Sequence, residues 1–137
     1  MGFVDLHSHI LYGLDDGAKT LDDSVEMLRI AADGGTTDIV ATPHANSQYR
    51  IDFALIDRRI AELATRTDVR IHRGCDFRLQ PDNIMDALAH PAKYTVNAQA
   101  YLMLEFPDAT IFPNTDAILL ERLDAGMVPI ITHPERN

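Results

Sequence analysis

The sequence predicts an α/β protein built on a parallel β-sheet. Short apolar segments alternate with segments whose apolar residues follow helical spacing, in the order β-α-β-α-β-α-β-α-β. Such alternation favours parallel strands joined by right-handed helical crossovers, and it fits both an open sheet and a closed barrel. A length of 137 residues, without repeats, low-complexity tracts or linkers, predicts a single domain over 1–137.

Five strands are expected. Each is a short, mostly apolar run bounded by glycine, proline or polar residues. The runs cover residues 3–6, 38–42, 69–72, 101–104 and 128–132.

Four helices are expected between these strands. The first has the clearest start, because Thr20 is placed as an N-cap and Asp23 completes a capping box, and Gly34-Gly35 should end it. The second carries apolar residues at 53, 56, 60 and 63, the third covers 84–89, and the fourth runs from 113 to 126.

A possible metal ligand stands at or just after the end of every predicted strand. The carboxyl ends of parallel strands share one edge of the sheet, and sites form there. Two histidines in an x-His-x-His pattern also point the same way along a strand. Imidazole and carboxylate groups together suit Mn, Fe or Zn. The predicted ligands are His7, His9, His44, Asp76, Glu105 and His133.

Two further residues are candidates for the chemistry beside such a centre. Asp15 and Asp16 could form only a turn, but they follow His9 closely, and one of them could act as a general acid or an outer ligand. Arg136 could reach the same pocket as a phosphate clamp, or it could form a surface salt bridge with Glu135.

The other potentially reactive residues are expected to have no catalytic role. His72 lies inside a strand and His90 ends a helix, so both are expected to be structural or exposed. Cys75 could suggest a thiol phosphatase, but that chemistry needs an arginine six residues after the cysteine, and Pro81 stands there.

Composition limits the classes of partner. The net charge of -9 disfavours non-specific binding to nucleic acid or to anionic membranes. No apolar run is long enough to cross a membrane, and the N-terminus does not resemble a signal peptide. With a single cysteine, a cytoplasmic location is the expectation.

Several segments together resemble the PHP (polymerase and histidinol phosphatase) superfamily. They are DLHSHIL at 5–11, GLDDG at 13–17, ATPH at 41–44, LEFP at 104–107 and THPER at 132–136. The DDG and THPER segments are more closely similar to the manganese-dependent tyrosine-protein phosphatases of the CpsB/YwqE type, which act in capsule and exopolysaccharide regulation.

The resemblance implies a distorted (β/α)7 barrel of the TIM-like PHP fold, with two or three divalent metal ions, most favourably Mn. By position, His7, His9 and Asp76 would hold one metal. Asp76 would bridge to a second metal that Glu105 and His133 also bind, and His44 would help to hold a third. Asp16 and Arg136 would either contact the substrate or support the metal ligands from behind.

The implied reaction is hydrolysis of phosphotyrosine on a bacterial tyrosine kinase of polysaccharide biosynthesis, by attack of a metal-bound hydroxide. Two alternatives stay open. One is another PHP phosphoesterase, acting on histidinol phosphate or a nucleotide. The other is a non-catalytic fragment that binds metal.

Three departures from the family pattern qualify this expectation. Asp76 stands where the family usually has Glu, and Asn137 where it often has Tyr. The late Asp-x-His pair of the family is absent from these 137 residues, and a full barrel needs roughly 200 to 250. We therefore expect an incomplete barrel with about five parallel strands, whose uncovered apolar interior favours a homo-oligomer.

Overall fold

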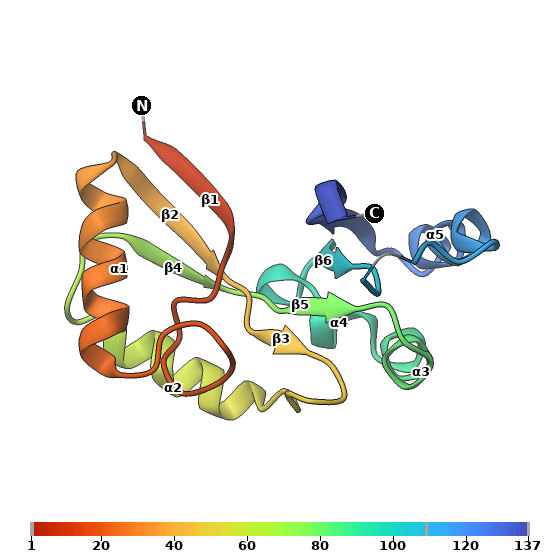
Figure 1. Cartoon of the computed structure of the whole chain (residues 1–137), viewed down its shortest axis with the longest axis horizontal. Helices are drawn as coiled ribbons and strands as arrows, with labels where there is room; N and C mark the ends of the chain where they lie inside the picture. Colours follow the sequence, from red (N-terminus) through yellow and green to blue (C-terminus); the bar gives the residue numbers. More distant parts are fainter. Residues whose placement is uncertain (1, 109, 137) are drawn as a thin grey trace.

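A computed structural model describes residues 2–108 and 110–136 and confirms the α/β class (Figure 1). The elements are β1 (Phe3–Ser8), α1 (Leu21–Asp33), β2 (Thr36–Ala41), β3 (His44–Ala45), α2 (Phe53–Leu63), β4 (Arg70–Arg73), β5 (Asp76–Arg78), α3 (Pro81–Ala89), α4 (Pro91–Tyr94), η1 (Val96–Ala98), β6 (Tyr101–Glu105), α5 (Thr115–Asp124), β7 (Val128–Thr132) and η2 (Pro134–Arg136). Asn137, which departs from the family pattern, lies outside the described residues.

Two of the five predicted strands are each followed, after a two-residue break, by a second short strand that was not predicted. β2 and β3 are separated by Thr42-Pro43, and β4 and β5 by Gly74-Cys75. Proline has no N–H to donate to a sheet ladder, so an interruption at Pro43 is expected on physical grounds. The broken strands stay neighbours, because Gly74 donates a 3.0 Å backbone hydrogen bond to Ala41 and Asp76 donates one of 2.9 Å to Pro43.

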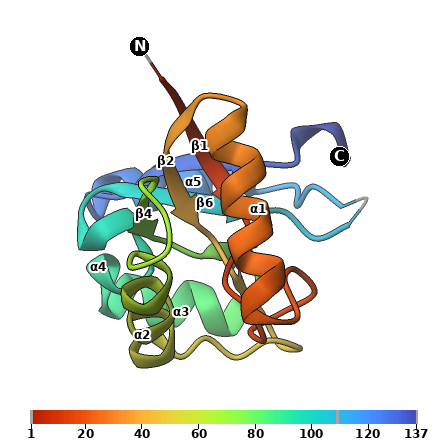
Figure 2. The ribbon, with the colours of Figure 1, turned by 90° about the vertical axis from the view of Figure 1, so that its left-hand side faces the viewer.

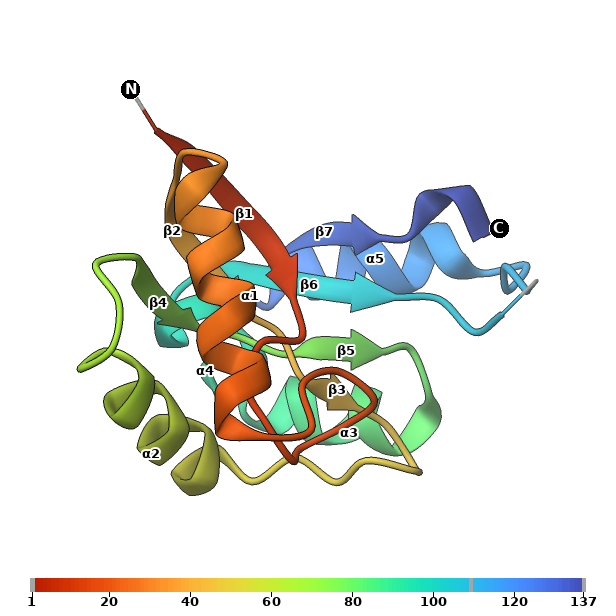
Figure 3. The same ribbon diagram turned by 60° about the vertical axis from the view of Figure 1, so that its left-hand side comes forward.

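The breaks divide the strands into two parallel sheets, ordered β1-β2-β4 and β3-β5-β6-β7. Followed across the breaks, the five strand paths lie side by side in the order of the sequence, with their carboxyl ends at one edge (Figure 3). This sequential order is typical of a barrel wall, whereas a doubly wound sheet reverses its order part-way.

Each sheet has its own apolar core. Helices α1 and α2 cover the first sheet (Figure 2), where Leu28 and Ile56 pack with Ile39 of β2. The second core lies between the other sheet and α3, α4 and α5, and it contains Phe77 and Leu104. Large apolar side chains elsewhere in the strands are exposed, namely Val4, Leu6, Tyr101 and Val128.

The first helix begins and ends as predicted. Thr20 and Asp23 form the reciprocal capping box, and Gly34 caps the other end. Gly35 then adopts a φ of +87°, a conformation that glycine alone takes without cost. The third helix begins at Pro81, earlier than the predicted 84, because proline is favoured in the first turn. Within the described residues, no helix is long and apolar enough to cross a membrane.

Candidate metal centre

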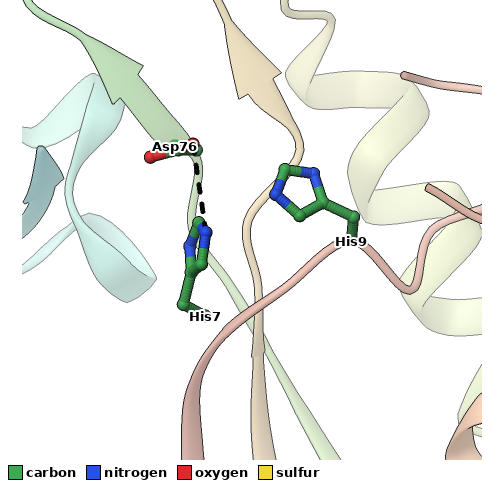
Figure 4. A group of neighbouring side chains, drawn as sticks. All are labelled: His7, His9 and Asp76. Carbon is green, nitrogen blue, oxygen red and sulfur yellow. Dashed lines mark ion pairs between the residues drawn. The ribbon is translucent and has the colours of Figure 1, made fainter. Parts of the chain in front are cut away.

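The six predicted ligands lie close together, where β1, β6 and β7 end and where the other two strand paths are broken. They are His7 of β1, His9 just after it, His44 of β3, Asp76 of β5, Glu105 of β6, and His133 just after β7. The rings of His7 and His9 and the carboxylate of Asp76 lie around one space (Figure 4). The expected placement is therefore observed, and the role of these residues as ligands stays a prediction.

Asp76 lies at the centre of the group. Its Oδ2 atom is 3.2 Å from Nδ1 of His44 and 4.0 Å from Nε2 of His7. Three sets have ligand atoms that all lie within 4.8 Å of one another: His7, His9 and Asp76; His9, Asp16 and His44; and His44, Asp76 and Glu105. Because the sets share members, cations bound in neighbouring sets would share ligands.

His133 lies beside His7, whereas the resemblance places it with Asp76 and Glu105. The Nε2 atoms of the two histidines are 3.1 Å apart. Imidazole nitrogens this close either share a proton or direct both lone pairs at one ion about 2.1 Å from each. The backbone of His133 has a φ of 50°, which is uncommon for a residue with a side chain and is often found at functional sites.

Buried atoms without partners indicate that a cation fits here. Among the described residues, Oδ2 of Asp76 and Nδ1 of His44 are buried and have no hydrogen bond of good geometry, although they lie 3.2 Å from each other as an ion pair. A buried polar atom left unpaired costs about 1 to 3 kcal/mol, and more when it is charged. Imidazole and carboxylate donors around such atoms match the ligand preferences of Mn, Fe and Zn.

The charge states also suit cation binding. Burial works to raise the pKa of Asp76, but nearby His44 and His7 and the hydroxyl of Thr132 outweigh it and lower the pKa. Asp76 is therefore ionised at neutral pH. Burial, the largest effect on His7, lowers the pKa of that imidazole despite the Asp76 carboxylate, so a lone pair is available at neutral pH. His44 differs, because its hydrogen-bonding contact with Asp76 raises the pKa of the imidazole, so a cation that binds this ring would take the place of a proton.

A second layer of polar residues fixes the orientation of the ligands. The hydroxyl of Thr42 lies 2.9 Å from Nδ1 of His7, and the carboxylate of Asp15 lies 2.7 Å from Nδ1 of His9. In both histidines Nε2 is thereby left for the site. The hydroxyl of Thr132 donates a 2.9 Å hydrogen bond to Oδ1 of Asp76. Such partners raise ligand basicity and hold the rings in place.

The structure gives Asp15 and Asp16 different surroundings, whereas the sequence did not show which of them would act at the site. Asp15 is buried and also accepts hydrogen bonds from the backbone of Gly17 and of His44. Burial works to raise the pKa of Asp15, but the hydrogen bond from His9 and those two backbone bonds lower it. The Asp16 side chain is 64% exposed, with Oδ1 3.4 Å from Nε2 of His44. Asp15 thus orients ligands, and Asp16 faces the site.

Replacing Gly17 by alanine is expected to weaken the affinity for Mn²⁺ by about tenfold, because a Cβ at this position would collide with the backbone and Cβ of His9. The loop that carries Asp15 would then move away from His9. Calorimetric titration with Mn²⁺ measures the effect. Gly34→Ala is the matched control, since its Cβ would meet nothing closer than 3.4 Å. Equal affinities in the two variants would contradict this prediction.

Two arginines flank Glu105. The Arg136 side chain is 52% exposed, and its Nη1 lies 3.8 Å from Oε1 of Glu105. Its Nε also lies 4.0 Å from Glu135, so both expected contacts are present. Arg136 borders a cavity of about 270 Å³, which is also lined by His9, Asp16, Gly17, His44 and His133. The second arginine, Arg78, was missed, although its position two residues after Asp76 in the same strand places it on the same face.

The remaining candidates lie apart from the centre, as expected. His72 contacts Asp38 at 2.9 Å, and exposed His90 lies 3.3 Å from Asp86. Cys75 is fully buried, and burial raises the pKa of its thiol far above the normal range. A protonated, enclosed thiol is no nucleophile.

Comparison with known proteins identifies related sequences. CapC of Staphylococcus aureus is 34% identical over 98% of the chain, and the tyrosine-protein phosphatase YwqE of Bacillus subtilis (strain 168) is 33% identical over 98%. The chain covers 54% and 55% of these two proteins, so it spans about half the length of the curated relatives it matches.

A solved structure gives the same result. It belongs to a study of YwqE from Bacillus subtilis and CpsB from Streptococcus pneumoniae, described as unique metal-dependent tyrosine phosphatases. The match covers 98% of this chain and 57% of the solved chain, with a TM-score of 0.89 and 30% sequence identity. Residues 3–137 match the family model for capsular polysaccharide synthesis, CpsB/CapC. The chain therefore belongs to the CpsB/CapC family, as its DDG and THPER segments indicate.

Proposed function

We propose that this chain binds two or three divalent cations, most favourably Mn²⁺, and hydrolyses phosphotyrosine on protein substrates. The observation that carries the proposal is the buried carboxylate of Asp76, whose Oδ2 lies between His7 and His44 and which belongs to two overlapping sets of candidate ligands. Its place in a family whose members include tyrosine-protein phosphatases supports the choice of substrate.

The residues of the chain divide the work in this proposal. Divalent cations at such a centre make water acidic enough to supply a nucleophile near neutral pH and neutralise phosphoryl oxygens. Arg136 binds a phosphoryl oxygen at the mouth of the cavity it shares with Asp16. Asp16 would accept the proton that the attacking water releases and pass it to the tyrosyl oxygen. Because a phenol has a pKa near 10, this leaving group needs less protonation than an alkyl alcohol.

The wider assembly is also part of the proposal. The sequential strand order supports an N-terminal segment of a distorted (β/α)7 barrel, which further strands and a late Asp-x-His pair would complete. The exposed Val4, Leu6, Tyr101 and Val128 support association with a second copy. We further propose that the substrate is a bacterial tyrosine kinase of polysaccharide biosynthesis, and that the reaction takes place in the cytoplasm.

The proposed substrate is tested by comparing three phosphate esters with and without added Mn²⁺. We expect a phosphotyrosine peptide to be hydrolysed with the highest kcat/KM, and histidinol phosphate and a nucleotide to be poor substrates. If the peptide is the poorest of the three, another PHP phosphoesterase activity replaces the proposal. Full activity after treatment with a chelator would contradict the metal-dependent mechanism.

The second candidate is a non-catalytic role for this chain. It is favoured because the chain covers only about half the length of the relatives that it matches. Binding of Mn²⁺ without hydrolysis of either a phosphotyrosine peptide or p-nitrophenyl phosphate would establish this role for the 137-residue chain. Light scattering on the same sample gives the number of copies.

A further inference from the structure

We infer that Arg78 is a positioning residue for Glu105, and that it acts by joining Glu105 to Asp108 in the segment after β6. The inference rests on the proposed metal centre and adds to it the residue that orients one of its carboxylates. It concerns a basic side chain whose charge would by itself repel a cation.

The geometry places Arg78 between a buried and an exposed carboxylate. Its Nη1 lies 3.2 Å from Oε2 of Glu105, and its Nη2 lies 3.2 Å from Oδ2 of Asp108. The side chain of Glu105 is 4% exposed and that of Asp108 is 75% exposed. A planar guanidinium holds its donors in a fixed fork, so both contacts together define the direction of the side chain.

The backbone beneath Arg78 is firmly held. Arg78 and Glu105 are register partners at the ends of β5 and β6. The amide of Asn83 donates hydrogen bonds to the carbonyl oxygens of Arg78, at 2.9 Å, and Ala45, at 2.6 Å, and so ties β5 to β3. The N–H of Leu79 donates a 2.8 Å hydrogen bond to the carbonyl of Glu105. The guanidinium therefore extends from a fixed base.

Glu105 needs such a partner because its side chain has several rotatable bonds. Oε2 of Glu105 has two acceptor positions. One accepts from Arg78, and the atom also lies 3.8 Å from Nδ1 of His44, on the side of the centre. Arg78 thus directs this oxygen while leaving it able to bind a cation.

The other ligands with an orienting contact show the same arrangement. His7 is held by Thr42, His9 by Asp15 and Asp76 by Thr132. Arg78 gives Glu105 the corresponding contact. Partners of this kind commonly determine metal affinity by about 10- to 100-fold.

Two effects of opposite sign make the inference testable. If orientation of Glu105 dominates, loss of Arg78 weakens cation binding. If charge repulsion dominates, loss of Arg78 strengthens it. The sign of the change in Mn²⁺ affinity therefore distinguishes the two.

The experiment is a calorimetric titration of the 137-residue chain with Mn²⁺. We expect Arg78→Met to lower the affinity by about 10- to 100-fold and Arg78→Lys to lower it less, since lysine keeps the positive charge and can donate to one of the two carboxylates. Asp108→Asn should give a smaller loss than Arg78→Met. Arg29→Met is the control, because Arg29 loses the same charge and two carboxylate partners on the exposed face of α1. It should bind like the wild type.

Each other outcome overturns a specific part of the inference. Unchanged or tighter binding by Arg78→Met overturns the positioning role, as does a loss that Arg78→Lys does not reduce. An unchanged Mn²⁺ affinity with a raised KM for an aryl phosphate would instead make Arg78 a substrate contact. Wild-type affinity in Asp108→Asn removes Asp108 from the inference. If the wild-type chain binds no Mn²⁺, the proposed metal centre fails, and the role of Arg78 fails with it.

Discussion

Replacing Asp76 by asparagine is expected to reduce Mn²⁺ affinity by more than about a hundredfold and to abolish any metal-dependent phosphatase activity. Loss of a residue that merely orients a ligand already costs about 10- to 100-fold, and Asp76 contributes a ligand atom to two of the three candidate sets. Asparagine keeps the size of the side chain and can still accept the hydrogen bond from Thr132. The fold should therefore persist.

Two measurements separate the site from the fold in this variant. Mn²⁺ at a concentration of 100 times Kd should raise the unfolding free energy of the wild type by about 2.7 kcal/mol and should leave that of Asp76→Asn nearly unchanged. Asp124→Asn, on the exposed end of α5, makes the same chemical change and should respond like the wild type. An Asp76→Asn protein still stabilised by Mn²⁺ to the wild-type extent would remove Asp76 from the centre.

Replacing the next residue, Phe77, by alanine is expected to lower the stability of the fold and to leave the candidate metal centre of the folded protein intact. Side chains alternate along β5, so Asp76 faces the centre and Phe77 packs in the second core, where it is fully buried. Removing a buried aromatic ring costs about 3 to 5 kcal/mol of unfolding free energy. Urea denaturation of the metal-free protein measures this loss.

The core substitution also has a matched control. Tyr101→Ala removes an aromatic ring that is 54% exposed, so its cost should be much smaller. Below the unfolding transition, the part of the Phe77→Ala population that is folded should still bind Mn²⁺. A stability loss of Phe77→Ala no larger than that of Tyr101→Ala would contradict the position of Phe77 in the core.

Much of the fold follows from local patterns in the sequence. Apolar periodicity located the strand paths, and cap chemistry located the first helix, because both depend on neighbouring residues. The predicted strands end close to the breaks, at Thr42 and His72, but their continuation as β3 and β5 was missed. A Cβ at Gly74 would come within 2.8 Å of Val40, so glycine allows the close approach of β4 and β2. That requirement depends on a distant strand and is invisible in the local sequence.

The edge of the sheet could be predicted, but its finer organisation could not. The rule that parallel strands end together placed His44 and Glu105 near each other without any knowledge of distances. Which aspartate would be buried depended on the path of the loop over His9, which selected Asp15. The position of His133 beside His7 depended on its backbone φ of 50°. These features arise from tertiary packing, which periodicity does not encode.

The two strand breaks have a consequence for cooperativity. They divide the molecule into two cores, which are joined only at their margin by Ile51 and Phe53 among the described residues, and the candidate centre contains residues from the sheets of both cores. His7 comes from the sheet of the first core, while His44, Asp76 and Glu105 come from the sheet of the second. A cation bound by residues of both sheets would act as a cross-link. Local opening of one core would then require the loss of the cation, so the cation would raise the free energy of opening for both cores.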